Sequence, residues 1–94
     1  MNDNEEKAVT IIIGRVQRDE DGPQTEVHVL LVAPDDDTAV HNTLEALKAE
    51  GYAFAELDQI GEMQEEPDEE PYASAYQGAL EGEIAVVKAG EIRR

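Results

Sequence analysis

Two histidines, His28 and His41, are the residues of this chain best suited to proton transfer or metal binding. His28 lies in a segment whose pattern predicts a strand, and His41 lies in the helical segment that follows. Because this strand leads into this helix, the two imidazoles could meet and bind a metal together with a carboxylate. No spacing requires such a site, and solvated positions are the simpler interpretation. We predict no metal site and no cofactor.

Covalent and acid–base catalysis have little support among the remaining residues. Cysteine is absent, and the single serine, Ser74, stands in a predicted helix rather than in a Gly-x-Ser-x-Gly turn. Glu56 and Asp58 interrupt an otherwise apolar strand, and burial there would raise the pKa of either carboxyl group. An outward-facing position on the sheet is the simpler interpretation, so we predict no catalytic residue.

Motifs for calcium and for phosphate are incomplete. The turn at 19–22 has the Asp-x-Asp-Gly order of a calcium loop, with Gly22 at the sixth position. Gln17 and His28 then fall at the first and twelfth positions, where acidic ligands are needed. The seven glycines are isolated and form no phosphate-binding loop.

Acidic residues dominate the composition, with 23 Asp and Glu against 7 Lys and Arg and a formal net charge of −16. Such a surface repels phosphates and anionic lipids, so we predict no direct nucleic-acid binding and no membrane association. No apolar run approaches the roughly 18 residues of a membrane span. The first seven residues are too acidic for a targeting signal, which predicts a cytoplasmic protein. The acidity is consistent with solubility, with adaptation to high salt, or with a basic protein partner.

The segment 62–76 is the best candidate for partner binding. Its first part is the acidic loop at 61–70, which carries six carboxylates and no cation. Two tyrosines follow it one helical turn apart, and amphipathic aromatic residues beside charge are common in interfaces. The alternative is that the tyrosines anchor a helix to the sheet and that the loop is merely solvated. The residues predicted to bind a basic protein partner are Glu62, Glu65, Glu66, Asp68, Glu69, Glu70, Tyr72 and Tyr76.

Six secondary-structure elements are expected to position these residues. Asp35, Asp36, Asp37 and Thr38 are suited to capping the start of a first helix that Gly51 ends, and Asp68 is expected to cap a second helix that Gly82 ends. Val40, Leu44 and Leu47 recur at helical spacing and are expected to face the core. The continuous apolar run at 30–33 indicates a strand buried on both faces. The expected elements are strands at 9–16 and 26–33, a helix at 34–50, a strand at 52–60, a helix at 69–81 and a strand at 83–89.

The order β-β-α-β-α-β predicts an α+β fold, a two-layer sandwich with a four-stranded mixed sheet and two helices. A ferredoxin-like variant would result if the third strand segment bent near Gly61 and paired twice. We expect a disordered acidic start at 1–7, a single domain at 8–90 and a polar tail at 91–94. The small core makes a homodimer a further hypothesis, through strand edges formed by 9–13 and 84–87.

These observations favour a small, non-catalytic interaction or regulatory module with a basic protein partner. One alternative is an acidic inhibitor of a basic target, either an immunity-type protein or a nucleic-acid mimic. Another is a small enzyme that uses carboxylates with His28 or His41.

Overall fold

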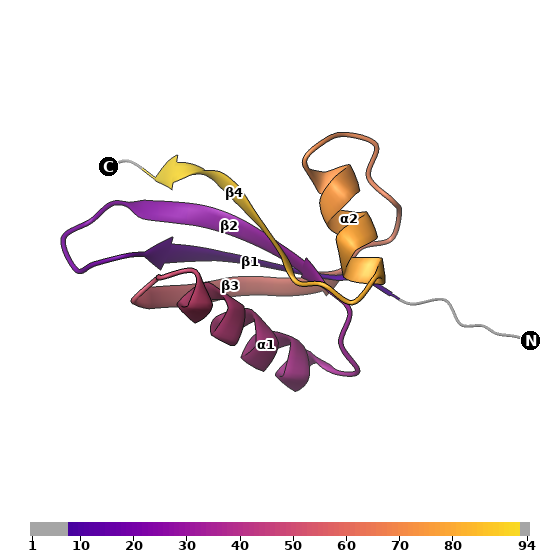
Figure 1. Cartoon of the computed structure of the whole chain (residues 1–94), viewed down its shortest axis with the longest axis horizontal. Helices are drawn as coiled ribbons and strands as arrows, with labels where there is room; N and C mark the ends of the chain where they lie inside the picture. Colours follow the sequence, from indigo (N-terminus) through magenta and orange to yellow (C-terminus); the bar gives the residue numbers. More distant parts are fainter. Residues whose placement is uncertain (1–7, 93–94) are drawn as a thin grey trace, which may run out of the picture.

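The computed structural model describes residues 8–92 and shows four strands and two helices in them (Figure 1). The predicted α+β class and the order β-β-α-β-α-β are confirmed. The predicted disordered start, 1–7, and the last two residues of the predicted tail lie outside the described residues. The elements are β1 (Thr10–Gln17), β2 (Gln24–Leu31), α1 (Asp36–Ala49), β3 (Phe54–Glu62), α2 (Tyr72–Leu80) and β4 (Ala85–Ile92).

The sheet has the strand order β3-β1-β2-β4, and every neighbouring pair is antiparallel. The expected mixed sheet is therefore corrected to an antiparallel one. A helix of 14 residues spans about 21 Å, so α1 returns the chain to the hairpin turn and β3 runs back beside β1. Among the described residues β3 pairs only with β1 and continues through Gly61, so the ferredoxin-like alternative is not formed. The proposed dimer edge at 9–13 is also wrong, because β1 is an inner strand.

The two helices lie on opposite faces of the sheet (Figure 1). Side chains alternate along a strand, so Val29 and Leu31 pack in the core cluster under α1 while Leu30 packs in the cluster under α2. All three are fully or almost fully buried, which confirms that the end of β2 is covered on both faces. The sheet is thus the middle layer, and the expected arrangement of two layers does not describe the positions of the helices.

The ends of α1 follow the sequence prediction. The backbone N–H of Thr38 donates to Asp35 Oδ1 at 2.8 Å, and Gly51 adopts a φ of 101° just after the helix. The buried positions, however, are Ala39, Thr43 and Leu47, while Leu44 is 40% exposed. The small side chains of Ala39 and Thr43 let the helix approach the sheet. Of the predicted stripe, Leu47 is buried and Val40 packs against the core, while Leu44 faces away from it.

Helix α2 is shorter than predicted and covers only the end of the sheet where β1 begins (Figure 1). It begins at Tyr72, and Asp68 does not cap it. Instead, Glu70 Oε1 accepts a hydrogen bond from the backbone N–H of Ser74 at 3.1 Å. Gly82 follows the helix with a φ of 98°, as expected for a helix end. The opposite half of this sheet face remains open.

Candidate partner-binding surface

The carboxylates gather at the end of the sheet where α1 and α2 begin. Strand β2 leads to the start of α1 at this end, and β3 ends there and continues into the loop at 63–71 (Figure 1). We call this region the acidic end, and the region around the turn at 18–23 the hairpin end. The carboxylate residues of the acidic end are all exposed: Asp35, Asp36, Asp37, Glu62, Glu65, Glu66, Asp68, Glu69 and Glu70.

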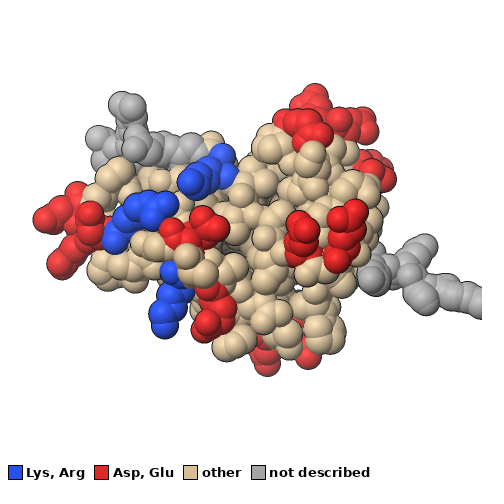
Figure 2. Space-filling model, in the orientation of Figure 1, with Lys and Arg blue, Asp and Glu red and all other residues tan. Residues whose placement is uncertain are grey.

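The described cations lie toward the opposite end. Within residues 8–92, Lys and Arg occur only at Arg15, Arg18, Lys48 and Lys88. On the face of the molecule drawn in Figure 2, basic side chains lie in the half that holds the hairpin. The charged residues near α2 on that face are all acidic. Arg18 stacks over the Tyr52 ring, with 4.5 Å between its Cζ atom and the ring centroid. The charge of the described molecule is therefore polarised along its length.

The loop at 63–71 is fastened to the fold at several points. The backbone N–H of Met63 donates to Val9 O at 2.8 Å, and Gln77 Nε2 donates to Glu66 Oε2 at 2.8 Å. Glu70 is engaged at the start of α2. By contrast, within the described part of the chain the carboxylates of Glu65, Asp68 and Glu69 have no hydrogen-bond or ion-pair partner. The loop thus presents three acidic side chains that have no partner within residues 8–92.

The two predicted interface tyrosines pack against the protein's own core. Both Tyr72 and Tyr76 are half-buried beside the cluster that contains Leu30, Ala75 and Ala79. The hydroxyl group of Tyr72 also lies 2.7 Å from a ring nitrogen of His28. This packing supports the anchoring alternative for the tyrosines, while all six predicted carboxylate residues are exposed.

His28 joins β2 to α2 through a chain of hydrogen bonds. Its Nε2 atom lies 2.7 Å from Glu26 Oε2, and its Nδ1 atom lies 2.7 Å from the Tyr72 hydroxyl oxygen. Because a carboxylate only accepts, we assign the imidazole proton to Nε2, so that Nδ1 accepts the hydrogen bond from Tyr72. Strand alternation could have predicted the Glu26–His28 pair, since residues two apart share a face. Nothing in the sequence pointed to the contact with Tyr72, 44 residues away.

The same residues border a cavity at the acidic end. It has a volume of about 420 Å³ and is lined by His28, Met63, Pro67, Asp68, Glu69 and Tyr72. Apolar side chains and two acidic residues, Asp68 and Glu69, thus line a single hollow.

The two histidines, which could have met in space, lie apart. His41 is exposed on α1, whereas His28 contacts α2 on the opposite face of the sheet. Among residues 8–92, no group of three or more His, Cys, Asp or Glu side chains is arranged to hold a metal ion. Ser74 is exposed on α2, in agreement with its predicted position on a helix surface.

Glu56 and Asp58 face outward on the open half of the sheet, as the simpler interpretation held. Arg15 binds Asp58 through two hydrogen bonds of 3.0 and 2.9 Å, and its Nη2 atom lies 3.1 Å from Glu56 Oε1. The hydrogen bond from Arg15 is the main reason that the pKa of Asp58 is lowered, opposite to the direction expected for a buried group.

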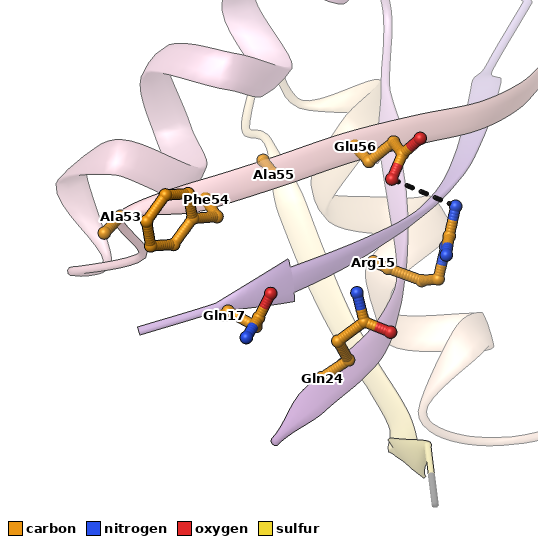
Figure 3. Close-up of a pocket in the computed structure, with 7 residues that line it drawn as sticks. All are labelled: Arg15, Gln17, Gln24, Ala53, Phe54, Ala55 and Glu56. Atoms are coloured by element: carbon orange, nitrogen blue, oxygen red, sulfur yellow. Dashed lines mark ion pairs between the residues drawn. The ribbon is translucent and has the colours of Figure 1, made fainter. Parts of the chain in front are cut away.

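Figure 3 shows Arg15 and Glu56 beside Gln17, Gln24 and Phe54 around a cavity of about 480 Å³ on this open face. Two carboxylates share the single charge of Arg15, so the cavity does not offer an anion-binding site.

No helix within residues 8–92 has the length and apolar character needed to cross a membrane. Comparison with family models, with curated proteins and with solved structures gave no match.

Proposed function

We propose that this chain is a small, non-catalytic protein-interaction module whose acidic end binds a basic segment of a protein partner. The observation that carries the proposal is the separation of charge: the acidic end has nine exposed carboxylate residues, and the described cations lie elsewhere. Opposite charge on a partner would be attracted and oriented before contact, because a field of one sign steers association. Cytoplasmic location remains a prediction.

The chain offers a matched pair of variants to test this proposal. The acidic-end triple variant carries Glu65→Gln, Asp68→Asn and Glu69→Gln, which removes three carboxylates that have no partner in the described structure. The hairpin triple variant carries Asp19→Asn, Glu20→Gln and Asp21→Asn and changes the net charge equally. Any difference between the two therefore reports position rather than total charge.

Affinity capture from native lysate tests both variants against the wild type, with washes at low and high salt. We expect one basic protein to be retained by the wild type and the hairpin triple variant at low salt and released at high salt. The acidic-end triple variant should lose it. Equal retention by the two variants, or retention of no partner, would contradict the proposal. A captured protein that is itself nucleic-acid-binding, and is inhibited by this chain, would specify the inhibitor alternative.

The Glu26–His28–Tyr72 chain supports a second candidate, a small enzyme that uses His28. His28 could accept the phenolic proton of Tyr72 at Nδ1 while Glu26 holds the imidazole through Nε2. A hydrolase or isomerase substrate screen tests this candidate. The enzyme would be favoured over the interaction module if turnover is lost in Tyr72→Phe and in His28→Gln but kept in Tyr76→Phe.

A further inference from the structure

We propose that the partner binds as an extended segment along the outer edge of β3, adding a strand to the sheet and placing apolar side chains in the groove beside α1. This inference rests on the proposed function and specifies the partner chemistry: basic and apolar residues that alternate along the segment.

The outer edge of β3 is available for strand addition. Strand β3 spans Phe54–Glu62 and stands first in the order β3-β1-β2-β4. Among the described residues, no strand pairs with its outer side. An edge strand presents unpaired backbone N–H and C=O groups, which an extended peptide can satisfy.

An apolar groove runs between this edge and α1. Ile12, Val40, Leu57 and Ile60 line a cavity of about 140 Å³ there, to which Asp58 and Gln59 also contribute. Ile60 is 39% exposed, and Leu44, one helical turn beyond Val40, is 40% exposed. The apolar stripe that α1 was predicted to bury is thus only partly covered by its own sheet.

The groove leads into the acidic end. Ile60 also lines a neighbouring cavity of about 320 Å³, which includes Asp35, Asp36 and Glu62. Neither of the two cavities is lined by a Lys or Arg residue. An occupant that fills the apolar part of the groove would therefore meet carboxylates at one end, which a basic residue complements.

The two faces of β3 determine the pattern of the occupant. Leu57 packs with the core under α1, and Ile60 is paired with the buried Ile12 of that core. Glu56 and Asp58 instead contact Arg15 on the opposite face, where two negative charges share one positive charge. Side chains of an added strand alternate between the faces, so apolar residues would face α1 and basic residues would face Glu56 and Asp58.

A second copy of the chain is a poorer occupant of the edge. Two copies would each bring a net charge of −16, and β3 of each would carry Glu56, Asp58 and Glu62. Their repulsion, together with the bulge where β3 passes the step from Ile13 to Gly14, is typical of edges protected from self-pairing. A basic partner segment relieves this repulsion instead of adding to it.

Two octapeptides of equal charge test the inference: one alternates lysine with valine, the other lysine with serine. We expect the wild type to bind the lysine–valine peptide about tenfold more tightly, because only valine buries apolar surface in the groove. Ile60→Ser should abolish this preference and leave binding of the lysine–serine peptide unchanged. Ile84→Ser is the matched control, since Ile84 is 36% exposed and lines neither cavity of the groove. Amide hydrogen exchange in β3 should slow when the lysine–valine peptide binds.

Each contrary result has its own meaning. Binding of neither peptide would overturn the proposed function and this inference together. Equal binding of both peptides, unaffected by Ile60→Ser, would overturn the groove and leave the acidic end intact. If the lysine–valine peptide binds and the hydrogen exchange of the β3 amides does not change, the addition of a strand would be overturned. A dimer of the free chain that Ile60→Ser dissociates would assign the edge to a second copy and also overturn the proposal.

Discussion

The acidic end and the hairpin end differ both in the number of their carboxylates and in the cations beside them. Each end holds three consecutive acidic residues, at 35–37 and at 19–21. At the hairpin end Arg18 and Lys88 line one cavity with Asp19, and Lys48 lies in the last turn of α1, whose end Arg18 contacts. The acidic end has no Lys or Arg among the described residues. The sequence total of −16 therefore conceals an uneven distribution, and position rather than net charge distinguishes a binding surface from a merely soluble one.

Strand β3 runs from the hairpin end to the acidic end, and its pairing with β1 has a bulge beside Gly14. A substitution of Gly14 is expected to have the largest effect on stability. A Cβ atom on Gly14 would lie 2.5 Å from Glu56 O and 3.0 Å from Leu57 Cδ2, so Gly14→Ala should force β3 away from β1. We expect a loss of about 1–3 kcal/mol in the free energy of unfolding, measured by urea denaturation. Gly61→Ala is the control, because no atom lies within 4 Å of its Cβ position. Equal losses in both variants would contradict the account of the bulge.

A smaller loss is expected where α2 is anchored at the acidic end. Tyr72→Phe removes the hydroxyl group that donates to His28 and leaves a half-buried acceptor without its partner. The free energy of unfolding should fall by about 0.5–1.5 kcal/mol. Tyr76→Phe should change it much less, since no hydrogen bond of its hydroxyl group is found among the described residues. A reversed order in denaturation experiments would rule out the anchoring role of Tyr72.

The repulsion among carboxylates should be stronger at the acidic end than at the hairpin end, and added salt should reduce this difference. At low ionic strength we expect the acidic-end triple variant to melt a few degrees above the wild type, and the hairpin triple variant to gain less. The wild-type Tm should itself rise with added salt, and the advantage of the acidic-end variant should shrink. Calorimetry in low and high salt measures both trends. Equal gains by the two variants would mean that the repulsion is spread evenly.

The smallest effect concerns the cap of α1. Hydrogen bonding to the Thr38 backbone lowers the pKa of Asp35 below its ordinary value of 3.8. The charged cap therefore stabilises the fold above that value, and its contribution is lost as the pH falls through the lowered pKa. Asp35→Ala should lower the Tm at pH 7, and the gap to the wild type should close in acid. Asp37→Ala, which removes a charge from the same turn without removing the cap, should lower it less.

Local signals explain why part of the fold could be predicted. Asp35 and Gly51 define the ends of α1 through their immediate neighbours, and the apolar run at 30–33 correctly indicated burial on both faces of β2. The strand order was not predictable, because it depends on how α1 returns the chain. The buried stripe of α1 was misplaced at Leu44, since the close approach of Ala39 and Thr43 to the sheet leaves no local pattern.

The candidate surface, too, could be predicted from the sequence only in part. The acidic loop could be recognised from composition, since six of its ten residues are carboxylates. That none of the Lys and Arg residues within 8–92 lies near it became visible only when β3, α1 and α2 met at one end. The ion pair of Arg15 with Asp58 and the hydrogen bond of His28 with Tyr72 join residues 43 and 44 positions apart. Contacts at such distances depend on the sheet register and leave no signal in the spacing of residues.

Mapping a basic probe onto the backbone amides tests the central claim most directly. Two-dimensional NMR spectra of the labelled chain would be recorded during titration with the lysine–serine octapeptide at low salt. We expect saturable shifts concentrated at 35–37 and 62–70, with smaller changes at 18–22, and their disappearance at high salt. Shifts that are equal at both ends, or largest at 18–22, would contradict the claim that the acidic end is the binding surface.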